Sequence, residues 1–400
     1  MSFTTFLDNL AVSMKLSEKE LALLKTPDHV RKATLEVSGK KYEAFRVQFN
    51  NSRGPYKGGI RFHPEVNEEE VTDLSFWMTI KTAVLDLPLG GGKGGVTVNP
   101  KELSIKEIEE LSRAYVRAFS EFLGEDKDVP APDVYTTPQI MAWMLDEYEK
   151  ILGKSAKAMI TGKPIENGGS EGRGIATAQG GAYILRELLD SMAKPLNETK
   201  VVIQGFGNAG SVMTKILSGW GVKVIGVSDS KGGLIDENGL DVQHVIECKQ
   251  SGGSVTSCDG KVVSSEDFLS TPCDVLIPAA LGGVITPENV NSINAPIILE
   301  LANGPVTAEA EEILTSKDVI IIPDILANAG GVTVSYFEWL QNKQNEHWSE
   351  KEVLEKLEKK MVVAFTDVFL EQKKGGTFRK AAYKVAIKRI LEAERKRGRL

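Results

Sequence analysis

The chain has 400 residues and a formal net charge of −7 at pH 7, and its composition is 42% hydrophobic and 26% charged. Such a length and composition are typical of a folded chain with two hydrophobic cores. The negative charge argues against a dedicated nucleic-acid-binding protein, and no stretch approaches the roughly 18 consecutive apolar residues that a membrane span needs.

The N-terminal sequence and the cysteines both bear on where the protein is located. The N-terminus lacks a basic region followed by an apolar run, so no secretory signal is visible and we expect a cytoplasmic location. The three cysteines, Cys248, Cys258 and Cys273, show no paired metal-ligand spacing, and their odd number suits a reducing compartment. We therefore expect no bound metal.

Three lysines of the first hundred residues lie in unusual surroundings. Lys57 is followed by Gly58 and Gly59, and Lys93 interrupts the glycine run 90–95. Glycines let a backbone or a small molecule approach closely. Lys81 lies on the apolar stripe of a predicted helix over 74–87, where the plainer alternative is a lysine whose stem packs while its amine reaches water. Together, the three amines could hold an anionic substrate.

Two further helices are predicted before residue 152. Ser104 and Glu107 form a capping box for a helix over 104–124, which Gly124 can close. A second helix begins at Thr137 and Pro138 and runs to about residue 151. Between them, two prolines stiffen the approach to Asp133, so its carboxylate is an acid/base candidate, although an Asx turn is the simpler interpretation.

The central part of the chain alternates short apolar strands with helices. Strands are predicted over 201–203 and 222–227, separated by a helix over 208–220, and further strands recur at the ranges 275–277, 297–299 and 319–322. This alternation predicts a doubly wound parallel α/β sheet. Two helices follow, over 349–370 and 378–396, and Gly375-Gly376 separates them.

A dinucleotide-binding fingerprint lies in this second part. Gly205-Phe206-Gly207-Asn208-Ala209-Gly210 follows a predicted strand and opens a helix, and Asp229 ends the next strand. The glycines allow the pyrophosphate to approach the helix N-terminus, and the acid can accept a hydrogen bond from a ribose hydroxyl. Asp229 favours NAD by repelling a 2′-phosphate, but Ser228, Ser230 and Lys231 could donate to one, so NAD and NADP both stay open.

Six ordered motifs resemble those of glutamate dehydrogenases, within the wider group that includes leucine, phenylalanine and valine dehydrogenases. They are the segments 57–64, 81–95, 130–133, 205–210, 303–305 and 328–331. The resemblance covers nearly the whole chain. It implies reversible NAD(P)-dependent oxidative deamination of an L-amino acid to a 2-oxo acid and ammonium, with hydride transfer to nicotinamide C4.

The resemblance also implies roles for individual residues. Lys81 would bind the substrate α-carboxylate, Lys93 would activate water, and Asp133 would shuttle protons. Lys57 and Ser335 would contact a distal carboxylate, which favours glutamate over an apolar amino acid. The remaining residues expected in the substrate site are Gly58 and Asn328. The residues expected to bind the coenzyme are Gly205, Phe206, Gly207, Asn208, Ala209, Gly210, Asp229, Thr177, Arg173 and Asn303.

We therefore predict two α/β domains. Residues 1–178 would form the substrate-binding and oligomerisation domain, to which the C-terminal helix 377–400 returns, and residues 179–376 would form the Rossmann domain. The resemblance suggests a homohexamer that acts on glutamate, 2-oxoglutarate and ammonium. Two alternatives are a related dehydrogenase of an apolar L-amino acid and a non-catalytic nucleotide-sensing protein of the same fold. The physiological direction and any allosteric effectors stay open.

Overall fold

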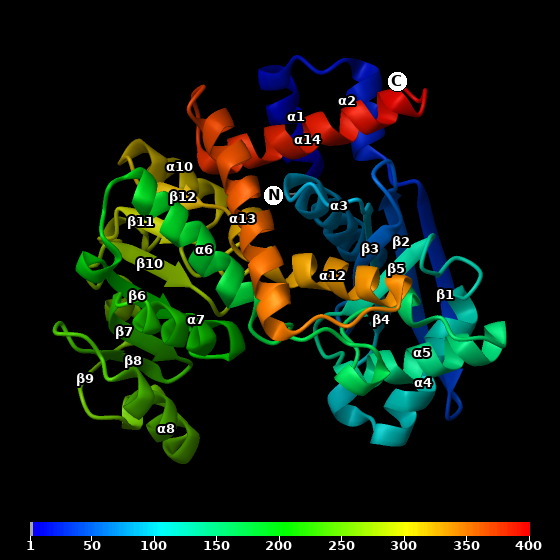
Figure 1. Ribbon diagram of the computed structural model, residues 1–400, viewed down its shortest axis with the longest axis horizontal. Helices are drawn as coiled ribbons and strands as arrows, with labels where there is room; N and C mark the ends of the chain where they lie inside the picture. The colour runs from blue at the N-terminus through cyan, green and yellow to red at the C-terminus, as the bar shows by residue number, and fades with distance from the viewer. Residues whose placement is uncertain (1–2) are drawn as a thin grey trace. The chain divides into compact units, whose positions relative to one another are not determined.

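The computed structural model describes residues 3–400 and divides the chain into two compact units (Figure 1). The first unit consists of the chain up to Arg173 together with Val332–Val353 and Tyr383–Leu400, and the second consists of Gly174–Gly331 and Leu354–Ala382. The sequence predicts that 332–353 belongs to the Rossmann domain. The structure groups this segment with the first unit because its side chains hydrogen-bond to the segment 162–173.

A five-stranded sheet forms the centre of the first unit, with the strand order β1-β2-β4-β3-β5. Strands β1, β2 and β4 are antiparallel neighbours, whereas β3 runs parallel to both β4 and β5. The strands are β1 (His29–Val37), β2 (Lys40–Asn50), β3 (Tyr56–His63), β4 (Gly91–Thr97) and β5 (Asp128–Pro132). The helices are α1 (Phe3–Met14), α2 (Glu18–Lys25), α3 (Glu68–Val84), α4 (Ile105–Phe119), α5 (Pro138–Leu152), most of α12 (Gly330–Gln344) and α14 (Phe378–Lys396) from Tyr383 on.

Helix α4 begins where the sequence predicts and ends earlier. Ser104 caps it, and the Glu107 side chain accepts from the Ser104 backbone, as in a capping box. Its apolar face packs with α5 in one core cluster, and the two helices lie side by side in Figure 1. The helix ends at Phe119 rather than near Gly124, because Gly124 has a φ of +143° and forms a bridge with Asp128 that leads into β5.

The glycine run 90–95 is largely the strand β4, and none of its glycines has a positive φ. Its glycines are required by close neighbours within the protein: a Cβ at Gly91 would lie 2.1 Å from Thr79 Oγ1, and one at Gly94 would lie 2.2 Å from the Tyr115 hydroxyl. The run therefore lets the chain pack tightly around the strand that carries Lys93.

The second unit has a seven-stranded sheet with the order β12-β11-β10-β6-β7-β8-β9. Its strands are β6 (Lys200–Gln204), β7 (Lys223–Asp229), β8 (Gly232–Ile235), β9 (Lys261–Val263), β10 (Val275–Pro278), β11 (Ile297–Leu299) and β12 (Ile320–Ile322). Its helices are α6 (Ala176–Ser191), α7 (Asn208–Gly219), α8 (Val242–Gly252), α9 (Ser265–Leu269), α10 (Ala308–Ser316), α11 (Asp324–Ala327) and α13 (Glu350–Gln372) from Leu354 on.

The five strands predicted for this sheet are present and parallel, whereas β8 and β9 are antiparallel additions at one edge. Strands that are buried on both faces read as continuous apolar runs, which is why the parallel strands were visible in the sequence. Within residues 3–400, no helix combines the length and apolar character that crossing a membrane requires.

A buried ion pair joins β2 to β5 across the first sheet. Arg46 Nε donates to Asp128 Oδ2 at 2.8 Å, its Nη1 donates to the Gly58 carbonyl at 3.1 Å, and both side chains are fully buried. The guanidinium runs past β4, where the absence of side chains at Gly92 and Gly94 makes room for it. The pair therefore ties the two flanks of the sheet to β3.

We predict that Asp128→Asn lowers the thermal stability of the protein. The variant leaves the Arg46 cation buried with only part of its hydrogen bonding, a change that typically costs about 3–5 kcal/mol. The measurement is the thermal unfolding midpoint, with Asp126→Asn as the control because the Asp126 side chain is 70% exposed. Equal midpoints for the two variants would contradict the importance of the pair.

Candidate functional site

Lys57 and Lys93 lie on neighbouring strands of the first sheet. Lys57 follows the first residue of β3, and Lys93 is the third residue of β4; both are buried, with 1% and 6% of their surface exposed. Gly58, beside Lys57, has no room for a side chain, because a Cβ there would lie 1.6 Å from the Gly92 carbonyl oxygen. The sheet thus fixes both amines in place.

Lys93 and Asp133 form an ion pair at the end of β5. Lys93 Nζ lies 2.9 Å from Asp133 Oδ2, and Arg61 Nε donates to the same oxygen at 2.8 Å. The Asp133 backbone N–H donates to Thr136 Oγ1 at 2.7 Å, which fixes the turn. Burial would raise the pKa of the Asp133 carboxyl, but Lys93 and Arg61 outweigh it and hold that pKa below its ordinary value. The structure therefore brings together the two predicted acid/base residues.

Lys57 has surroundings that disfavour its charge. Burial, with Arg173 and Arg46 nearby, holds its pKa well below the ordinary value, and Glu338 and Asp128 only partly offset this. Its Nζ donates to the Pro130 carbonyl at 3.3 Å. Among the described residues, no carboxylate lies within ion-pair distance of this ammonium.

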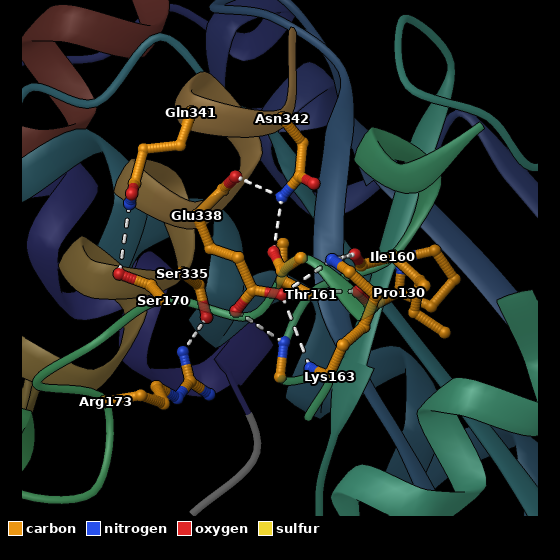
Figure 2. A network of polar contacts seen from close by, with 12 residues as sticks. Pro130, Ile160, Thr161, Lys163, Ser170, Arg173, Ser335, Glu338, Gln341 and Asn342 are labelled. Atoms are coloured by element: carbon orange, nitrogen blue, oxygen red, sulfur yellow. Dashed lines mark hydrogen bonds and ion pairs between the residues drawn. The ribbon is translucent and has the colours of Figure 1, made fainter. Parts of the chain in front are cut away.

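Ser335 lies on α12 in the first unit and is 2% exposed. Its hydroxyl accepts a hydrogen bond from Arg173 Nη1 (Figure 2). Arg173 was predicted for the coenzyme site, and it lies beside Ser335, a residue predicted for the substrate site. Burial lowers the pKa of Arg173, and the Glu338 carboxylate partly offsets the effect.

One turn further along α12, Glu338 makes a buried ion pair that the sequence analysis did not identify. Lys163 Nζ lies 2.6 Å from Glu338 Oε1, and both side chains are 0% exposed. The second carboxylate oxygen accepts from the Gly162 backbone at 2.8 Å, and Lys163 Nζ also donates to the Ile160 carbonyl at 2.6 Å (Figure 2). A separation of 175 residues along the chain hides this pair from any local pattern.

Lys81 lies in the last turn of α3 and is half-buried. The predicted helix is present, although it begins six residues earlier, at Glu68, where Asn67 caps it. Thr79, two residues before Lys81, lies against β4 at Gly91. The helix end that carries Lys81 is therefore packed on the strand that carries Lys93.

The predicted fingerprint forms the turn between β6 and α7 in the second unit. Gly205 has a φ of +100°, and its backbone N–H donates to the Ser228 carbonyl at 3.0 Å. A Cβ at Gly207 would meet no atom within 4 Å, so open space lies beside the residue that caps α7. The other members, Phe206, Asn208, Ala209 and Gly210, complete the turn and the first residues of the helix. The turn therefore leaves the backbone of Gly207 open to approach at the N-terminus of α7.

Asp229, the last residue of β7, is held by the last turn of α8 and by the loop that follows this helix. Its carboxylate accepts from Lys249 Nζ, from Ser254 Oγ at 3.1 Å and from the Val255 backbone at 2.9 Å. Burial would raise the Asp229 pKa, but these hydrogen bonds dominate and lower it to about 2. The carboxylate is therefore ionised at neutral pH.

A disulfide joins Cys248 and Cys258, which flank this loop, and leaves Cys273 as a free cysteine. The odd number of cysteines led us to expect a reducing compartment, and the disulfide runs against that expectation: two of the three cysteines pair because the fold brings them together. The bond closes the segment that holds Asp229.

Three further predicted residues lie in the second unit. Asn328 caps the C-terminus of α11, and its Nδ2 donates to Asn303 Oδ1 at 2.9 Å and to the Ala302 carbonyl at 3.2 Å. Thr177 lies in the first turn of α6, and its hydroxyl lies close to Gly331. The structure therefore joins a residue predicted for the substrate to one predicted for the coenzyme.

Comparison with known proteins decides the family. Residues 168–398 match the model of the Glutamate/Leucine/Phenylalanine/Valine dehydrogenase family, and residues 27–150 match that of the Glu/Leu/Phe/Val dehydrogenase dimerisation domain. The chain belongs to this dehydrogenase family. The predicted resemblance is confirmed.

Individual members of the dehydrogenase family are similar over most of the chain. An NAD-specific glutamate dehydrogenase of Staphylococcus aureus is 49% identical over 360 residues, which cover 90% of this chain and 87% of that protein. The crystal structure of the glutamate dehydrogenase from Peptoniphilus asaccharolyticus is 38% identical, with a TM-score of 0.90 and full coverage of both chains. The hetero-hexameric glutamate dehydrogenase from Thermus thermophilus, in its Leu-bound form, is 34% identical with a TM-score of 0.91, and the match covers 99% of this chain and 97% of that one. The predicted two-domain α/β fold is confirmed as well.

Proposed function

We propose that this protein catalyses the reversible, NAD-dependent oxidative deamination of L-glutamate to 2-oxoglutarate and ammonium. Its family and the names of its relatives support this reaction. The observation that carries the choice of substrate is the buried Lys57 ammonium, whose pKa is lowered and which makes one hydrogen bond at 3.3 Å, to a backbone carbonyl.

A distal carboxylate is the group that such a cation favours. An ammonium removed from water loses its hydration, and a negatively charged partner restores much of the lost free energy. Ser335 supplies a hydroxyl beside Arg173, so the first unit offers charged and neutral donors for the same carboxylate. An apolar side chain in this position would leave Lys57 buried without an anion, which disfavours leucine or valine as the substrate.

The chemical step rests on Lys93 and Asp133. We assign to Lys81 the substrate α-carboxylate, because its ammonium is carried on the helix end that packs on the Lys93 strand. Lys93 then orients the water that attacks the imino carbon, and Asp133, 2.9 Å from the Lys93 ammonium, takes up and returns the proton. Arg61 keeps Asp133 ionised and oriented between turnovers.

The coenzyme is expected at the fingerprint of the second unit. The open space beside Gly207 fits a pyrophosphate, and the ionised Asp229 fits a ribose with free hydroxyls better than one with a 2′-phosphate. When bound, NAD accepts the hydride from the substrate Cα. Lys249 already donates a hydrogen bond to Asp229. For Lys249 to neutralise the 2′-phosphate of NADP, it would have to leave this carboxylate.

Assembly and location extend beyond the single chain. We infer a homohexamer, because the chain matches the hetero-hexameric enzyme over 99% of its length. The match to a dimerisation-domain model over 27–150 supports self-association of the first unit. The cytoplasmic location stays a prediction from the sequence.

The proposed reaction predicts that the purified protein oxidises NADH only when 2-oxoglutarate and ammonium are both present. The decrease in absorbance of the reduced nicotinamide measures the rate, and NADPH in a parallel reaction should give a lower rate because Asp229 repels its 2′-phosphate. Oxidation with 2-oxoisocaproate but not with 2-oxoglutarate would replace glutamate by an apolar substrate. No oxidation with any 2-oxo acid would favour the non-catalytic alternative.

Lys57→Leu should cripple turnover of glutamate and spare or raise turnover of apolar amino acids. Loss of one partner from a buried charge pair costs about 2–5 kcal/mol, so kcat/KM for glutamate should fall by roughly 30-fold to 5,000-fold. The measurement compares kcat/KM for glutamate and norvaline, with Lys106→Leu as an exposed control. Unchanged glutamate kinetics in Lys57→Leu would sink the substrate assignment.

Asp133→Asn should reduce kcat by about 10²–10⁴-fold, because the amide cannot accept the proton from the reacting water. The affinity for NADH should stay close to that of the unmodified protein, since the fingerprint expected to bind the coenzyme lies in the second unit. Steady-state kinetics with Asp126→Asn as the control tests this expectation. A kcat within threefold of the control would remove Asp133 from the chemistry.

A further inference from the structure

The first unit contains a buried carboxylate, that of Glu338, to which the proposed reaction assigns no role. The Glu338 charge acts on three cationic groups, Lys57, Arg173 and Lys163, and partly offsets the lowering of the pKa that burial causes in each. Glu338 and Lys163 are both fully buried. A substrate carboxylate is therefore not the only anion that could neutralise Lys57.

Lys163 forms an ion pair with Glu338, the carboxylate that would otherwise compete with the substrate for Lys57. Glu338 Oε1 accepts from Lys163 Nζ at 2.6 Å and from the Lys163 backbone at 3.3 Å, while Oε2 accepts from the Gly162 backbone at 2.8 Å. These contacts hold both oxygens toward the segment 162–163 (Figure 2). Lys57 instead donates to the carbonyl of Pro130, a residue that also accepts from the Thr161 backbone at 3.0 Å.

We propose that Lys163 is a positioning residue for substrate specificity: by holding Glu338 in an ion pair, it keeps the Lys57 ammonium available for the distal carboxylate of a dicarboxylic substrate. This inference rests on the proposed function of Lys57. Lys163 acts through Glu338 and does not itself touch the substrate. Without the Lys163 ammonium, Glu338 is a buried anion that turns toward Lys57 and Arg173 and competes with the substrate.

The proposal makes opposite predictions for one variant and for its double variant. Lys163→Met removes the ammonium and leaves the competing carboxylate, so KM for 2-oxoglutarate should rise at least tenfold while kcat changes less than threefold. Lys163→Met/Glu338→Gln also removes the carboxylate charge, so KM should return to within threefold of the unmodified protein. Lys163→Arg should rescue KM as well, because it keeps the ion pair. Lys154→Met, which removes an exposed lysine nine residues earlier in the chain, is the control.

A binding measurement separates this proposal from the reaction itself. Glutarate is a dicarboxylate of the same length without an amino or oxo group, and its stabilisation of the protein is read as a shift of the thermal midpoint. The shift should shrink in Lys163→Met and recover in the double variant. If the unmodified protein binds glutarate but does not turn over 2-oxoglutarate, the proposed function fails and these shifts alone decide the role of Lys163.

Three results would overturn the proposal. The first is an equal rise of KM in the single and double variants, which would give Lys163 a purely structural role. The second is an unmodified protein that glutarate does not stabilise. The third applies if Lys163→Met does not fold, and it is a rise of KM above tenfold in Glu338→Gln, for which the proposal predicts a KM within threefold of the unmodified protein.

Discussion

The burial of the Lys57 ammonium is the constraint on which the rest of the first unit depends. A cation with 1% exposure, beside two arginines, is unfavourable unless the fold provides compensation. The strand β3 carries it, the glycine strand β4 packs directly against it, and the Pro130 carbonyl accepts its one hydrogen bond. The fold thus holds the amine in place and leaves it short of negative charge, which is the condition for recognising a carboxylate.

Two buried carboxylates act on Lys57 through space, and both are paired with other cations. Asp128 is bound by Arg46 and by Gln48 Nε2 at 2.9 Å, and Glu338 is bound by Lys163. Each acid therefore has a cation of its own, although both still act on Lys57 through space. Asp133 differs from these two acids because it pairs with both Arg61 and Lys93. Since Lys93 is assigned to the reaction, this ion pair has a proposed role in proton transfer.

Sequence patterns predicted the elements that local periodicity determines. They missed the contacts between residues that lie far apart along the chain. The parallel strands and the turn at Gly205 follow from apolar runs and spacing, and the structure contains both. The strand in the glycine run was not predicted. Its glycines are required because Thr79 and Tyr115 pack against them, and no local sequence motif reveals these contacts. The Lys163–Glu338 pair and the position of Arg173 beside Ser335 arise only when α12 packs in the first unit.

The most direct test of this account is proton uptake when 2-oxoglutarate binds to the NADH-loaded protein without ammonium. Calorimetry in buffers of different ionisation enthalpy, between pH 7 and 10, measures it. A carboxylate that pairs with Lys57 raises the pKa of that amine, so the unmodified protein should take up more protons than Lys57→Met at a pH between the free and bound pKa values. Equal uptake by the two proteins across this range would contradict the claim that the substrate carboxylate pairs with the buried Lys57 amine.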